Sequence, residues 1–121
     1  MKVYSLNLFL QVKRLEQDLQ FTDEMNNEIA DCFNMVMDFI EWNNSFITNN
    51  IKAMTEQELD KSIKYEQKID NIRNKLIDSS RKRLSKGFNP KAELLFMDII
   101  KHLEHIGDYS LNISQALEQI N

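Results

Sequence analysis

Residues that form tight turns are scarce in this chain, which contains only two glycines and one proline among its 121 residues. An all-β domain needs many tight turns, and glycine and proline are central to most of them. Helical bundles need few such turns. The sequence therefore predicts an all-α protein, and its length predicts one domain that can bury a core without disulfide bonds.

Charge and cysteine content narrow the class of protein further. The net charge is −4, so the sequence indicates no basic face for nucleic acid. A single cysteine, Cys32, cannot form an intramolecular disulfide and is typical of a small core residue in a cytosolic protein. No apolar run approaches the ~20 residues that span a bilayer. We therefore expect a cytoplasmic protein, or a cytoplasmic part of a larger membrane protein.

Two stretches mark helix boundaries. Thr55 and Glu58 have the spacing of a capping box, in which each side chain bonds the backbone of the other residue. The stretch 86–90, Lys-Gly-Phe-Asn-Pro, ends one helix and starts another, because glycine suits the position after a helix, asparagine the N-cap and proline the first turn. These signals predict helices over about 56–86 and 90–120.

An earlier segment, 25–51, carries apolar residues at three- and four-residue spacing, which predicts an amphipathic helix. Apolar residues also recur at helical spacing before residue 20. Thr22 either caps a separate helix or lies within one long helix, and the sequence leaves both open. We expect an antiparallel three-helix bundle over 21–121, preceded by a helical segment or connector over 1–20, or with an extended first helix.

Acidic and amide side chains recur at one spacing on the last two predicted helices. The two strings are Glu66, Asp70, Asn74 and Glu104, Asp108, Asn112. Residues four apart lie on one face of a helix, about 6 Å apart. Carboxylate oxygens in this arrangement suit hard metal cations. If the helices are neighbours, the four carboxylates converge on one site; the alternative is a solvated acidic face.

Helical periodicity also predicts where these acids face. On the middle helix, Glu66 and Asp70 fall on a flank of the core face. On the last helix, the predicted core residues are Leu95, Ile99, Ile106, Ile113 and Leu117. That assignment places Glu104 and Asp108 on the outer face. Gly107 costs ~1 kcal/mol relative to alanine inside a helix, which indicates a close approach of another backbone or of a ligand there.

The segments YEQKIDNI (65–72) and HLEHIGDYSLNI (102–113) resemble the two signature segments of the PhoU-like domain family. The third-helix motif of that family is typically L-E-R-I-G-D-x-x-x-N-I. The matching residues are Leu103, Glu104, Ile106, Gly107, Asp108, Asn112 and Ile113, with His105 in place of the usual arginine. On the second helix the matching residues are Glu66, Ile69 and Asp70. The resemblance covers about residues 21–121.

The resemblance implies a non-catalytic regulator of phosphate uptake that binds iron or zinc through Glu66, Asp70, Glu104 and Asp108. PhoU-like proteins usually carry two repeats, and this chain has one. A single repeat is similar to the C-terminal cytoplasmic domain of bacterial sodium–phosphate cotransporter family proteins. This similarity implies a partner, a phosphate transporter membrane domain in the same or another chain, and a location near the inner face of the cell membrane. One repeat also implies fewer metal ions, or a homodimer that completes the site.

Two histidines lie near the acidic string of the last helix. One interpretation is a second set of metal ligands, or an extension of the four-carboxylate set, made by Asp98, His102 and His105. The favoured alternative is a hydrogen bond between Asp98 and His102.

Two further groups of residues each have a functional and a structural interpretation. Phe39, Trp42 and Phe46 fall on one side of the first helix and form either a dimer or transporter surface, or a contact with the N-terminal segment. A basic end of the middle helix consists of Lys75, Arg81, Lys82, Arg83 and Lys86. It complements the helix dipole, and contact with anionic lipid or phosphate is the alternative.

Two other functions compete with metal-dependent regulation. All-α nucleotide pyrophosphatases hold Mg²⁺ with helix-borne acids and use the metal as a Lewis acid and to activate water. Those families favour acids three residues apart, whereas the spacing here is four. The other competitor is a structural helical module that dimerises without any metal.

Overall fold

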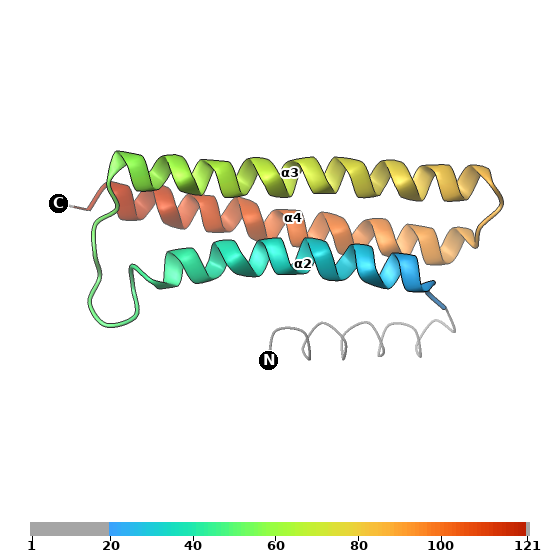
Figure 1. Ribbon diagram of the computed structural model, residues 1–121, viewed down its shortest axis with the longest axis horizontal. Helices are drawn as coiled ribbons and strands as arrows, with labels where there is room; N and C mark the ends of the chain where they lie inside the picture. Colours follow the sequence, from blue (N-terminus) through green and yellow to red (C-terminus); the bar gives the residue numbers. More distant parts are fainter. Residues whose placement is uncertain (1–19, 121) are drawn as a thin grey trace.

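A computed structural model describes residues 20–120 of the chain as three long helices: α2 (Asp23–Asn44), α3 (Glu56–Ser85) and α4 (Pro90–Glu118). The helices lie side by side and alternate in direction (Figure 1). The predicted antiparallel three-helix bundle is confirmed. The predicted N-terminal segment falls almost entirely outside the described residues. None of the described helices is long and apolar enough to cross a membrane.

The first helix of the bundle is shorter than predicted at its C-terminal end. Its start is capped by Thr22, whose Oγ1 accepts a hydrogen bond of 3.1 Å from the Met25 amide, so α2 begins as a separate helix. It ends at Asn44 rather than near residue 51, which leaves Ile47 and Ile51 exposed in the following loop.

The capping signals around α3 and α4 act as predicted. Thr55 and Glu58 form the reciprocal bonds of a capping box at the start of α3. Gly87 has a φ of +87° directly after the helix, a conformation that costs glycine little. Asn89 accepts hydrogen bonds from the amides of Lys91 and Ala92 and so caps α4. Local side-chain chemistry thus fixes both ends of the short α3–α4 connection.

The α2–α3 loop is anchored to the C-terminal end of α4. Phe46 and Met54 are buried in this loop and form a small apolar cluster with Leu117. The Met54 amide donates a hydrogen bond of 3.1 Å to the Leu117 carbonyl. In Figure 1 the loop and the C-terminus accordingly lie at the same end of the bundle.

The buried face of α4 differs from the predicted one. Ile106 and Ile113 are 40% and 45% exposed, whereas Glu104 is buried. The polar and small residues on the buried face of α4 include Glu93, Glu104, Gly107, Ser110 and Ser114. The prediction from apolar periodicity is confirmed for Ile99 and Leu117, which are buried, and is wrong for Ile106 and Ile113. Small residues on this face let the helices approach closely, and the Ser110 carbonyl and the Ser114 hydroxyl both bond the buried side chain of Asn43. The prediction that Glu104 lies on the outer face is therefore also wrong.

Candidate metal centre

The acids of α3 lie at the edge of its core face, as the sequence predicted. Ile69 is fully buried in the main core and fixes the orientation of this part of the helix. Glu66, three residues earlier, is 9% exposed, and Asp70 is partly buried. Both carboxylates therefore leave α3 beside the contact with α4, which is the most extensive helix contact in the bundle.

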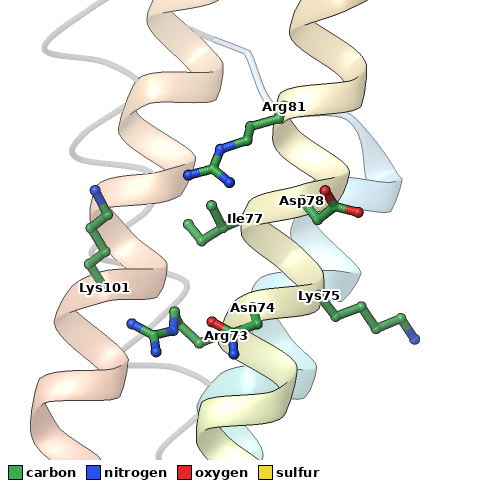
Figure 2. A pocket seen from close by; sticks show the side chains of 7 residues that line it. All are labelled: Arg73, Asn74, Lys75, Ile77, Asp78, Arg81 and Lys101. Atoms are coloured by element: carbon green, nitrogen blue, oxygen red, sulfur yellow. The ribbon is translucent and has the colours of Figure 1, made fainter.

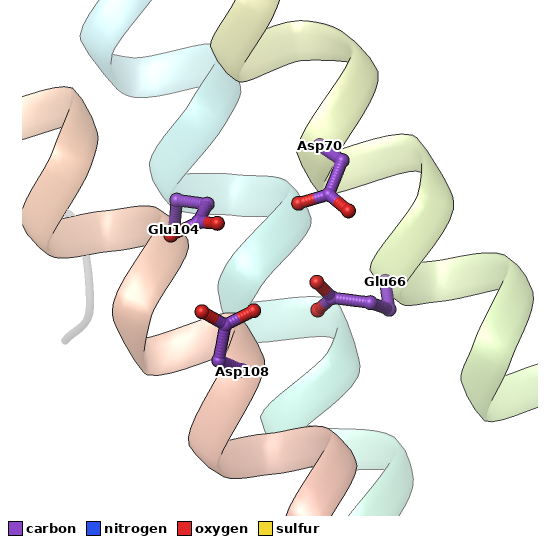
Figure 3. A group of neighbouring side chains, drawn as sticks. All are labelled: Glu66, Asp70, Glu104 and Asp108. Atoms are coloured by element: carbon purple, nitrogen blue, oxygen red, sulfur yellow. The ribbon is translucent and has the colours of Figure 1, made fainter.

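Gly107 brings α4 close to these acids. A Cβ atom at this position would lie 3.2 Å from the Cδ1 of Ile69 and 3.4 Å from the Oε2 of Glu66. The glycine therefore allows the α4 backbone to lie directly against α3 at the level of Glu66. Glu104 and Asp108, on either side of Gly107 in sequence, extend from α4 toward the acids of α3 (Figure 3).

The four carboxylates converge between α3 and α4. One oxygen from each of Glu66, Asp70, Glu104 and Asp108 lies within 4.8 Å of the others. Within residues 20–120 this is the one group of three or more His, Cys, Asp or Glu side chains close enough to share a metal ion. Four negative charges at this separation repel one another strongly unless a cation or protons neutralise them.

The pKa values of two glutamates in the cluster are raised, first by burial and then by the neighbouring carboxylates. Burial, followed by the neighbouring carboxylates of Asp108 and Asp70, raises the pKa of Glu66 from 4.5 to about 8. Burial and Asp108 also raise the pKa of Glu104, against an opposing effect of Arg73. Glu66 is therefore largely protonated at neutral pH in the absence of a cation.

Two carboxylate oxygens in the cluster have no hydrogen-bond partner. Oε2 of Glu66 and Oδ1 of Asp70 are both buried and unpaired. An unpaired buried acceptor is costly, and a bound cation or a proton shared between two carboxylates would satisfy it. The acidic cluster thus combines the donor chemistry of a metal site with unfilled acceptor capacity.

Few positive charges compensate the cluster. Nη1 of Arg73 lies 3.7 Å from Oε1 of Glu104, and Nε2 of the exposed His105 lies 3.8 Å from Oε2 of the same residue. Both separations exceed hydrogen-bond length. The described cationic groups near the cluster therefore approach only Glu104 and leave the other three carboxylates unneutralised.

The remaining predicted polar residues lie at the surface. Asn74, Asn112, Asp98 and His102 are all exposed. Asp98, His102 and His105 do not form a second cluster in the described part of the chain, and no hydrogen bond joins Asp98 to His102 there. The predictions of a second metal set and of an Asp98–His102 hydrogen bond are therefore wrong, because these exposed side chains do not converge.

The predicted partner surface on α2 belongs instead to the core. Phe39 is fully buried and stacks on Tyr65 of α3, with ring centroids 5.4 Å apart. Trp42 donates a hydrogen bond of 2.9 Å to Ser62, and the rings of Trp42 and Phe46 pack edge-on. The surface interpretation was wrong because these rings fill the space between α2, α3 and the α2–α3 loop.

A buried ionic network joins all three helices and was missed by the sequence reasoning. Arg83, assigned above to the basic end of α3, is 5% exposed and bonds both oxygens of Glu93, which is 1% exposed. The same guanidinium bonds Glu28 of α2 at 2.8 Å, and Ser80 donates to Glu93 at 2.6 Å. The signal available in the sequence was a lone acid, Glu93, within an apolar run at the start of α4.

The fold and the cluster together define a class of protein: a three-helix bundle in which two adjacent helices hold a shared cluster of carboxylates. The chain matches the family model of the PhoU domain over residues 22–117, and it therefore belongs to the PhoU domain family. The PhoU domain is associated with the regulation of phosphate homeostasis, in a family that is regulatory and non-catalytic. No curated protein and no solved structure matches the chain.

Proposed function

We propose that the chain is a metal-binding, non-catalytic regulatory domain associated with phosphate transport. The observation that carries this proposal is the convergence of four carboxylates from α3 and α4 within 4.8 Å of one another. A metal cation would neutralise charges that otherwise repel, and it would stabilise the contact between the two helices. Occupancy of the site would then regulate the surface that these helices present to a partner.

The residues present fit a metal. The site supplies only oxygen ligands, from Glu66, Asp70, Glu104 and Asp108. Oxygen ligands suit hard cations such as Fe³⁺ or Mn²⁺, and Zn²⁺ accepts them as well. Two of the carboxylate oxygens are buried without a partner, so a cation would satisfy groups that no described residue satisfies. Iron or zinc is proposed from the family resemblance, and His105 beside Glu104 offers a nitrogen that zinc also accepts.

The proposed partner is a phosphate transporter membrane domain, in the same chain or in another one. The support is the resemblance of a single PhoU-like repeat to the C-terminal cytoplasmic domain of sodium–phosphate cotransporter family proteins. The proposal includes a position at the inner face of the cell membrane and a homodimer. A test is phosphate uptake in native cells that carry Glu104→Gln/Asp108→Asn: altered uptake at unchanged protein level is expected, and unchanged uptake would contradict a role for the cluster in transport.

The metal proposal is tested by elemental analysis of purified protein. The wild type is expected to contain iron or zinc, and Glu104→Gln/Asp108→Asn is expected to lose most of it. The matched control is Asp60→Asn/Glu118→Gln, which also removes two negative charges, one from α3 and one from α4, at positions away from the cluster. Metal retained by the cluster variant, or absent from the wild type even after incubation with either ion, would leave a structural module as the better interpretation.

A further inference from the structure

A second polar feature lies on the α3–α4 contact, beside the acidic cluster. It is a hollow of about 600 Å³ lined by Arg73, Asn74, Lys75, Ile77, Asp78, Arg81 and Lys101. Arg73 and Arg81 extend from α3 toward α4, and Ile77 lies between these two arginines (Figure 2). Lys101 comes from α4, and its side chain runs along that helix (Figure 2). Four cationic residues thus line the hollow; Lys75 extends to the other side of α3 in Figure 2, and the other three come from two helices.

The positive charge of this hollow is only partly compensated within the part of the chain that the structure describes, by the long ion pair between Arg73 and Glu104. Its one acidic lining residue, Asp78, points to the other side of α3 in Figure 2 and pairs with Lys82 at 3.4 Å. No ion pair to a described residue engages Arg81 or Lys101. A concentration of unpaired cations in a chain of net charge −4 attracts an anion from solution.

The guanidinium of Arg73 is only partly engaged. Its Nε is buried and has no hydrogen-bond partner. Its contact with Glu104 is 3.7 Å, which is an ion pair longer than a hydrogen bond. Arg73 therefore retains donors in the planar arrangement that recognises the oxygens of a phosphate group.

We propose that this hollow is a binding site for a phosphate group. Two arginines supply directional donors and Lys101 supplies a mobile point charge, which together suit a tetrahedral dianion. The hollow is larger than one phosphate ion, so it also accommodates a phosphate group carried by a larger molecule. The phosphate group can come from free phosphate or pyrophosphate, or from the headgroup of an anionic lipid. The site does not require a metal ion and stands independently of the function proposed above.

The test uses the full 121-residue chain, freed of metal by a chelator so that no cation–phosphate complex forms. Inorganic phosphate and pyrophosphate are titrated at constant ionic strength against a sodium chloride control. Vesicles of phosphatidylglycerol in phosphatidylcholine, with pure phosphatidylcholine vesicles as control, test the lipid source. The variant is Arg81→Gln/Lys101→Gln, which changes two exposed residues of the hollow and leaves Arg73 in place. Its matched control is Lys64→Gln/Lys91→Gln, which removes the same charge from exposed positions on the same helices.

We expect the wild type to bind at least one phosphate-bearing probe, and Arg81→Gln/Lys101→Gln to weaken that binding about tenfold or more, with little effect of the control pair. Binding of vesicles alone would assign the phosphate group to a lipid, and binding of the free ions would assign it to a soluble ligand. The proposal is overturned if no probe binds, or if both variant pairs weaken binding equally. The metal content of Arg81→Gln/Lys101→Gln should equal that of the wild type, which separates this site from the acidic cluster.

Discussion

The backbone of Gly107 on α4 lies so close to the side chain of Ile69 on α3 that a Cβ at position 107 would stand 3.2 Å from the Cδ1 of Ile69. This contact sets the spacing of the two helices beside Glu66 and Glu104. A larger side chain at position 107 must therefore move either Ile69 or the whole of α4.

Gly107→Val is expected to lower the free energy of unfolding by about 1–3 kcal/mol, because the added methyl groups overpack the contact with Ile69. In Gly107→Ala the gain of about 1 kcal/mol in helix propensity opposes a small shift of the Ile69 side chain, so the net change should stay within about 1 kcal/mol. Urea unfolding of both variants measures the difference. Equal stability of Gly107→Val and the wild type would mean that the helices do not approach closely here.

The buried pair of Arg83 and Glu93 gives the next prediction. Arg83→Met removes the cation that bonds both oxygens of a carboxylate only 1% exposed. An uncompensated buried charge of this kind costs about 3–5 kcal/mol. We expect this loss in the free energy of unfolding, and a large recovery in the double variant Arg83→Met/Glu93→Leu, which removes both charges.

Lys82→Met is the control for that pair. Lys82 makes an ion pair with Asp78 at 3.4 Å, but both side chains are mostly exposed. Exposed ion pairs contribute about 0–1 kcal/mol, so the loss should be small. Similar losses in Arg83→Met and Lys82→Met would contradict the structural importance of the buried network.

The helix boundaries were predictable from sequence because they depend on local chemistry. Thr55 and Glu58 satisfy backbone groups within one turn of themselves, and Gly87 adopts its φ of +87° without help from distant residues. The cluster position on α3 was also predictable, since Ile69 fixes the core face of that helix. The matching spacing of the two acidic strings and the position of Gly107 indicated that the acids of α4 could meet those of α3, whereas apolar periodicity placed Glu104 and Asp108 on the outer face.

The buried face of α4 was only partly predictable from apolar periodicity, which was right for Ile99 and Leu117. Gly107 and Ser114 are buried because they are small, and Ile106 is partly exposed although it is apolar. Which face is buried depends on the shape of α3 and on polar partners such as Asn43 of α2, which lie far away in sequence. The metal at the resulting cluster stays a prediction.

Asn43 illustrates such a distant partner. Its Nδ2 donates a hydrogen bond of 2.7 Å to the Ser110 carbonyl, and its Oδ1 accepts one of 2.6 Å from the Ser114 hydroxyl. Asn43→Ala leaves both groups of α4 buried without this partner, so we expect a loss of about 1–3 kcal/mol in urea unfolding. Asn44→Ala, at the adjacent exposed position, should change stability by no more than about 0.5 kcal/mol. Equal effects of the two variants would contradict the role of this bond.

The acidic cluster predicts how the stability of the metal-free protein depends on pH. Glu66 faces Asp70 on its own helix and Asp108 on α4, and its pKa rises from 4.5 to about 8. Between pH 4.5 and about pH 8 the folded protein holds a proton on Glu66 that the unfolded chain has released. Raising the pH therefore favours the unfolded chain, and stability should fall from about pH 4.5 to about pH 8. The raised pKa of Glu104, which also faces Arg73, acts in the same direction.

Glu66→Gln tests this pH dependence directly, because the amide cannot ionise and resembles the protonated acid. In the presence of a chelator, the variant should match the wild type near pH 4.5 and should be more stable than the wild type above pH 8. Asp60→Asn, an exposed change on the same helix, should follow the wild-type curve. Thermal unfolding at several pH values measures all three proteins. Two results would contradict this prediction: wild-type stability that does not fall over this pH range, or an equally steep fall in Glu66→Gln. Either result would mean that Glu66 ionises freely and that the four carboxylates do not converge as described.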